Sequence, residues 1–206
     1  TMSSNLTAAT GLDALTHAIE ALVSNASSEL TDLNALEAIK LVFNNLQSAI
    51  NNPKDLEARK KMSLASMMAG LAFSNASLGA VHAMAHSLGG LLDLPHGECN
   101  AILLPFVISA NYNSAKEKYN LIGDMMGFFP PDIDEKNKKV ILCGKIKELA
   151  KKAGIECSLA PYNIEDSILD TLAENAFNDA CIITNPRELS IEDIKKIYET
   201  ARWRSA

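Results

Sequence analysis

The sequence predicts an all-α fold, a bundle of about eight or nine helices in a single domain over residues 1–206. Apolar residues recur at intervals of three or four along nearly the whole chain, which is the spacing of one helix face. The apolar fraction of 48% and the charged fraction of 21% are typical of a globular protein. The one strand-like run, residues 181–184, is too short to change this class.

Signals for helix starts and ends divide the first half of the chain into four segments. Ser28 suits the N-cap of the second segment, and Pro53 suits the first turn of the third. The fourth begins near Ser77, and the Gly89-Gly90 pair is typical of its C-terminal end. We therefore expect helices over residues 11–23, 27–50, 53–73 and 77–90.

The second half of the chain contains five further helical segments. Residues 100–112 could form a strand by composition, but their length and helical neighbours favour a buried helix. Ser190 and Asp193 have the spacing of a capping box at the start of the last segment. The expected helices cover residues 100–112, 116–126, 138–153, 164–178 and 190–202.

Charge and cysteine usage narrow the possible partners and location. The net charge of −6 and the pI near 5.2 argue against nucleic acid or an anionic membrane as partners. No apolar run approaches the roughly 18 residues of a membrane span, and no secretory signal is evident. The four cysteines form no C-x-x-C pair, as in a protein with reduced thiols. We expect a cytoplasmic protein.

All four histidines fall into one pattern with an aspartate. Asp13 and His17 are four residues apart, as are His82 and His86, and His96 follows in a Pro-His-Gly turn. Residues four apart lie on the same face of a helix, so their side chains can converge on one ion. Imidazole nitrogen and carboxylate oxygen are both good ligands for divalent transition metals. The spacing predicts a metal site but does not decide which of the five groups is not a ligand.

Motifs for phosphate binding and for serine nucleophiles are missing from the chain. No G-x-G-x-x-G sequence follows a strand, and no P-loop or G-x-S-x-G sequence is present. Nothing in these 206 residues is therefore expected to bind a nucleotide phosphate unaided.

Four segments together resemble the iron-containing (group III) alcohol dehydrogenases. They are residues 11–20 (GLDALTHAIE), 81–89 (VHAMAHSLG), 95–101 (PHGECNA) and 185–187 (NPR). The resemblance spans the chain but only the C-terminal half of the family's proteins, whose helical domain is of the dehydroquinate synthase type. It implies an N-terminal Rossmann-like, nucleotide-binding domain that is not in this chain. With Thr1 in place of a Met, we expect a truncated product.

The resemblance also assigns roles within the histidine pattern. It implies that Asp13, His17, His82 and His96 are the metal ligands. It places His86 beside the nicotinamide, where we expect it to contact the cofactor and to act in catalysis as a proton relay.

Two further positions match the family's substrate pocket. Phe73 and Leu78 correspond to residues that line it, and simple core packing is about as good an explanation for both.

The resemblance implies the cofactors and substrate of an alcohol dehydrogenase. The cofactors are Fe²⁺, with Zn²⁺ as a possible replacement, and NAD or NADP bound mainly by the domain that is not in this chain. A divalent ion makes a bound alcohol more acidic, which favours hydride transfer to a nicotinamide. We expect a small primary alcohol or aldehyde as substrate, a homo-oligomer for the full-length protein, and no activity for these 206 residues alone.

Two functions of other classes remain open from the sequence. The metal could activate water in a hydrolase, which metal-dependent ester cleavage without NAD would reveal. The chain could also be a non-catalytic metal-binding module, which an NAD-binding titration would distinguish from part of a dehydrogenase.

Overall fold

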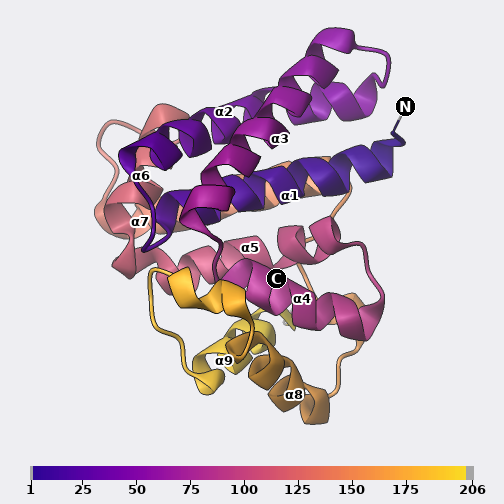
Figure 1. The fold of residues 1–206 in the computed structure, drawn as a ribbon, viewed down its shortest axis with the longest axis vertical. Coiled ribbons are helices and arrows are strands. Elements are labelled where there is room, and N and C mark those ends of the chain that lie inside the picture. The colour runs from indigo at the N-terminus through magenta and orange to yellow at the C-terminus, as the bar shows by residue number, and fades with distance from the viewer. Residues whose placement is uncertain (1, 203–206) are drawn as a thin grey trace.

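The computed structural model describes residues 2–202, and all its regular secondary structure over that range is helical (Figure 1). It confirms the all-α prediction, with nine α-helices, three short 3₁₀ helices and no strand among the described residues. The α-helices are α1 Ser4–Val23, α2 Glu29–Asn51, α3 Leu56–Ala76, α4 Ala80–Leu92, α5 His96–Asn111, α6 Lys116–Met125, α7 Glu135–Lys152, α8 Asp166–Phe177 and α9 Ile191–Arg202. The 3₁₀ helices are η1 Tyr112–Ser114, η2 Ala160–Tyr162 and η3 Ala180–Thr184.

Helix α5 is the centre of the packing. Helices α1, α2 and α3 pack against one another, and α1 contacts one side of α5. Helices α4, α7 and α9 contact other sides of α5, while α8 packs on α4 and α9 (Figure 1). Because neighbours cover it on several sides, α5 is buried over most of its length, as expected for a helix that is apolar all round.

The predicted choice of helix over strand for residues 100–112 is confirmed, but the helix starts earlier, at His96. Pro105 lies inside it and has no N–H to donate to the carbonyl of Ala101 four residues before. The thiol of Cys157 donates to this carbonyl, with Sγ and O 3.3 Å apart. A half-buried cysteine therefore satisfies an acceptor that the proline leaves without its helical partner.

Several caps agree with the sequence and several boundaries differ. Ser28 accepts a hydrogen bond from the backbone of Thr31 at the start of α2, and Ser190 and Asp193 form the expected reciprocal pair before α9. Helix α1 begins before residue 11 because the Ser3 side chain accepts from the backbone of Leu6 and caps it. The strand-like residues 181–184 belong to η3.

The glycine pair predicted to end the fourth helix lies inside it instead. Helix α4 continues through Gly89 and Gly90 to Leu92, and Asp93 ends it in a left-handed conformation with φ of 51°. Helix α3 begins three residues after Pro53 because the Asp55 side chain provides its cap.

No single described helix is both long and apolar enough to cross a membrane. Helices α3 and α4 meet the length and composition criteria only together, across a bend of 105°.

Candidate metal centre

Three helices bring the predicted ligands together. Asp13 and His17 lie one turn apart on α1, His82 lies on α4, and His96 is the first residue of α5. The N-terminus of α5 reaches α1 because Gly97 has no side chain. A Cβ added there would lie 2.2 Å from the backbone oxygen of Ala9, which is closer than real Cβ contacts.

The ligand atoms of Asp13, His82 and His96 all lie within 4.8 Å of one another. Asp13 Oδ1 is 3.8 Å from Nε2 of His82 and 3.5 Å from Nε2 of His96. Ligand atoms about 2.1 Å from one ion at tetrahedral angles lie roughly 3.4 Å apart, so these separations suit a bound transition metal.

Asn100 shows independently that these atoms converge on one point. Its amide nitrogen lies 2.7 Å from Asp13 Oδ1, 3.1 Å from His82 Nε2 and 3.0 Å from His96 Nε2. One amide nitrogen therefore lies within hydrogen-bond distance of three atoms that can each bind a cation when the two imidazoles are neutral. The residues present fit a divalent ion, and Asn100 would hold the Asp13 carboxylate in place beside it.

His17 is close to this group but is not part of its tightest cluster. Its Nδ1 lies 3.7 Å from Oδ2 of Asp13. Its ring stacks between those of His82 and Phe73, with both centroid distances 4.4 Å. Phe73 therefore lies beside the centre, in contact with a predicted ligand.

A buried carboxylate of α1 determines which nitrogen of His82 faces the centre. Glu20 Oε2 lies 2.5 Å from Nδ1 of His82, and both side chains are almost completely buried. The Nδ1–H group can therefore donate to Glu20, which leaves Nε2 directed at Asp13. Carboxylate–histidine pairs of this kind fix the tautomer of metal-binding histidines and raise their basicity.

The electrostatics of the centre differ between its histidines. Burial, together with the nearby His82, lowers the pKa of His17 to about 4, so His17 is neutral at pH 7. Burial opposes protonation of His82 as well, but Glu20 and Asp13 outweigh it and raise its pKa to about 9. An ion bound at Nε2 of His82 must therefore displace a proton.

Helix α4 has no capping side chain of its own, and distant residues cap it. The N–H of Ala80 donates to Asn185 Oδ1 and the N–H of Val81 donates to Glu20 Oε1. Asn185, from the Asn-Pro-Arg segment, also exchanges hydrogen bonds with Asn111 and is buried. These contacts fix the start of the helix that carries His82. Gly79 leaves room for Glu20 there, because a Cβ at Gly79 would lie only 2.9 Å from Oε1 of Glu20.

His86 makes a different contact from the predicted ligands. Its Nδ1 lies 2.8 Å from Oδ2 of Asp179, and its ring stacks on that of His96 at 5.2 Å. Asp179 also accepts a hydrogen bond from the backbone of Cys181. His86, Asp179 and Cys181 form a second group of potential ligands within 4.8 Å of one another.

Leu78 and Cys99 lie among contacts that hold the fold together. Leu78 is half-buried and its backbone oxygen accepts from Thr184. Cys99 lies three residues after His96, but it is fully buried and burial raises the pKa of its thiol to about 11, so it is a poor candidate ligand.

Glu20 provides a direct test of this arrangement. In the Glu20→Gln variant a single oxygen must serve both His82 and the N–H of Val81, so His82 is held less well. We expect the affinity for Zn²⁺ or Fe²⁺ to fall roughly 10–100-fold, as on loss of other outer partners of metal ligands. Competition with a chromophoric chelator would measure it.

Glu98→Gln is the matched control, because it makes the same charge change at a residue that accepts a hydrogen bond from Tyr162. It should bind metal as the parent does. If the Glu20 variant and the parent bound Zn²⁺ or Fe²⁺ with equal affinity, Glu20 would not support the metal centre.

Comparison with known proteins matches the chain to one family and to several of its members. Residues 7–202 match the Fe-containing alcohol dehydrogenase family, C-terminal part. The chain is 40% identical over 196 residues to a 1,3-propanediol dehydrogenase of Citrobacter freundii, covering 95% of this chain and 51% of that protein. It is 44% identical over 198 residues to alcohol dehydrogenase 4 of Saccharomyces cerevisiae (strain ATCC 204508 / S288c), covering 94% and 51%.

Solved structures agree with the sequence matches. An alcohol dehydrogenase from Oenococcus oeni superimposes with a TM-score of 0.93 at 39% identity, covering 97% of this chain and 52% of that one. The chain spans about half the length of the relatives it matches.

Proposed function

Because the chain belongs to the Fe-containing alcohol dehydrogenase family, we propose that it supplies the metal-binding half of an NAD(P)-dependent alcohol dehydrogenase. The observation that supports this proposal most strongly is the convergence of Asp13, His82 and His96, with the ring of His17 stacked on that of His82. The substrate proposed is a small primary alcohol, oxidised to the aldehyde, or the aldehyde in the reverse reaction. The names of relatives support this class, since they include an NADPH-dependent butanol dehydrogenase from Clostridium saccharobutylicum and an NAD-dependent methanol dehydrogenase from Bacillus methanolicus.

Each residue of the centre has a separate task in this proposal. Asp13, His17, His82 and His96 would hold the divalent ion, Fe²⁺ by the family description or Zn²⁺ in its place. When bound, such an ion makes an alcohol hydroxyl more acidic and polarises a carbonyl group. Glu20 keeps His82 Nε2 directed at the ion by accepting its Nδ1–H.

His86 is proposed to contact the nicotinamide and to move the hydroxyl proton. Its bond to Asp179 fixes the ring at Nδ1 and leaves Nε2 for exchange with substrate or water. Phe73, against His17, and Leu78 are proposed to line an apolar substrate pocket. The nicotinamide and its phosphates would bind mainly to protein outside these 206 residues.

The test is alcohol oxidation by the full-length protein loaded with Fe²⁺. We expect NAD- or NADP-dependent oxidation of 1-butanol or 1,3-propanediol that a chelator abolishes and added metal restores. These 206 residues alone should bind metal but oxidise neither alcohol. Metal-dependent cleavage of an ester panel without nicotinamide, and no alcohol oxidation, would favour a hydrolase instead.

A further inference from the structure

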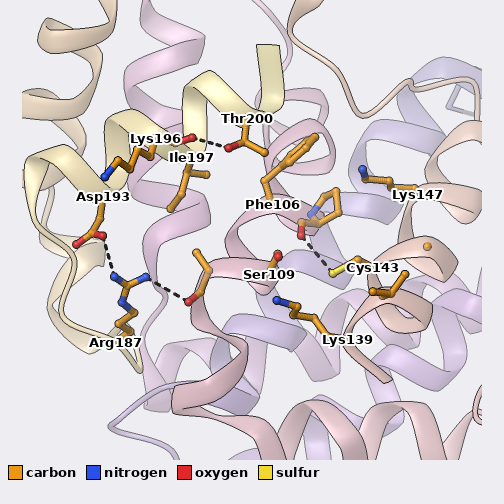
Figure 2. Close-up of a pocket in the computed structure, with 14 residues that line it drawn as sticks. Phe106, Ser109, Lys139, Cys143, Lys147, Arg187, Asp193, Lys196, Ile197 and Thr200 are labelled. Atoms are coloured by element: carbon orange, nitrogen blue, oxygen red, sulfur yellow. Dashed lines mark hydrogen bonds and ion pairs between the residues drawn. The ribbon is translucent and has the colours of Figure 1, made fainter. Parts of the chain in front are cut away.

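A groove of about 730 Å³ lies between α5, α7 and α9 (Figure 2). Lys139, Cys143 and Lys147 follow at four-residue intervals along α7, so a single face of this helix forms one wall. A face of α9 that carries Lys196 forms another wall, and Phe106 of α5 lies between them. None of the residues that line the groove contributes to the metal centre.

The groove carries an excess of positive charge in a chain whose net charge is −6. Its one acidic residue, Asp193, bonds to Arg187 at 2.7 Å, and Arg187 also donates to the backbone of Ala110. Lys139 and Lys147 are half-buried and have no acidic partner within ion-pair distance in residues 2–202. Their positive charge is therefore available to a ligand.

Other lysines of α7 show the contrast. Three lysines that do not line the groove pair with glutamates of the same helix; they are Lys138, Lys145 and Lys152. Lys136 and Lys151 of α7 have no such partner in residues 2–202 either, but they do not line the groove, so the unpaired cations that α7 presents to the groove are Lys139 and Lys147.

The walls between these cations are largely apolar. The amine of Lys147 lies 4.6 Å from the centre of the Phe106 ring, which favours a cation–π contact at that end of the groove. Pro105, Val140 and Ile197 provide further apolar surface. A concave site of this size, mostly apolar with a few directed charges, has the character of a small-molecule site.

We propose that this groove binds a small organic anion with an apolar body and a carboxylate, sulfonate or phosphate head group. The lysines of α7 would hold the head group, and Phe106 and Ile197 would contact the apolar body. A small molecule suits the dimensions better than a protein, because a stable protein interface needs roughly 800 Å² from each partner.

The probe is 8-anilinonaphthalene-1-sulfonate, an aromatic anion whose fluorescence rises in apolar surroundings. Its neutral analogue, N-phenyl-1-naphthylamine, has the same aromatic body without the sulfonate. We expect saturable binding of the anion to the folded protein and at least about tenfold weaker binding of the analogue, which corresponds to about 1.4 kcal/mol.

Two variants locate the binding. Lys139→Gln with Lys147→Gln removes the charge and should weaken binding of the anion about tenfold. Gly144 lines the groove, and a Cβ there meets nothing within 4 Å, so the fold can accept a larger side chain. Gly144→Leu should therefore fill the groove and block binding of the anion.

The controls make the same changes on α3. Lys60→Gln with Lys61→Gln removes two exposed charges, and Gly70→Leu adds a side chain where a Cβ also meets nothing within 4 Å. Both should bind the anion as the parent does, and circular dichroism would confirm that every variant is folded.

Three outcomes would overturn the proposal. The first is equal binding by the groove variants and the parent, which would place the probe elsewhere. The second is equal affinity for the anion and the neutral analogue, which would show that the lysines do not recognise charge. The third is a parent that self-associates in sedimentation while the groove variants do not, which would make this surface an interface between copies.

Discussion

His96→Ala should abolish tight binding of the metal, whereas His86→Ala should leave it intact. The two side chains are matched, because they are 43% and 45% exposed and their rings stack on each other. Only His96 directs a nitrogen at Asp13, while His86 bonds to Asp179. We expect the loss in affinity to exceed the roughly 10–100-fold that an outer partner contributes.

His82→Ala should lose the metal and also destabilise the fold. His82 is almost completely buried, and its removal leaves the Glu20 carboxylate without its cationic partner, with only the N–H of Val81 still donating to it. Breaking a buried ion pair in this way costs about 3–5 kcal/mol. Elemental analysis after metal loading and urea denaturation would measure the two effects. Metal loss by His86→Ala to the same extent as by His96→Ala would show that the predicted division between ligands and the remaining histidine is wrong.

Gly97→Ala should separate α5 from α1 and disrupt the metal centre without changing a ligand. The added Cβ would lie 2.2 Å from the oxygen and 2.7 Å from the carbon of the Ala9 carbonyl, so backbone must move. We expect a loss of about 3 kcal/mol, the upper end for overpacking, because backbone yields less than side chains do. His96 would move with α5, so metal affinity should fall as well.

Gly90→Ala is the control for this substitution. Gly90 lies inside α4, and a Cβ there meets nothing within 4 Å. Alanine should leave stability unchanged or raise it by up to about 1 kcal/mol, since glycine is unfavourable inside a helix. Equal unfolding free energies for the Gly97 variant and the parent would contradict the close approach of α5 to α1.

Local sequence spacing predicted the helices and the ligand candidates because both depend on neighbours along the chain. The pairs Asp13 and His17, and His82 and His86, are each separated by one helical turn, so periodicity alone placed each pair on a helix face. The helix over residues 100–112 was predicted from its length, although composition allowed a strand.

The supporting contacts could not be predicted because they join residues far apart in sequence. Val81 bonds to Glu20 across 61 positions, and Ala80 bonds to Asn185 across 105. Glu20 was visible only as part of the family resemblance, and a buried acid inside an apolar helix face is the one signal of its role. The end of α4 was misplaced because Asp93, rather than a glycine, adopts the left-handed conformation there.

X-ray diffraction from crystals loaded with Fe²⁺, recorded at the iron absorption edge, would locate the metal directly. We expect one anomalous peak among Asp13, His17, His82 and His96, at ligand distances of about 2.0–2.2 Å. A peak held instead by His86, Asp179 and Cys181, or no peak at Asp13, would contradict this expectation.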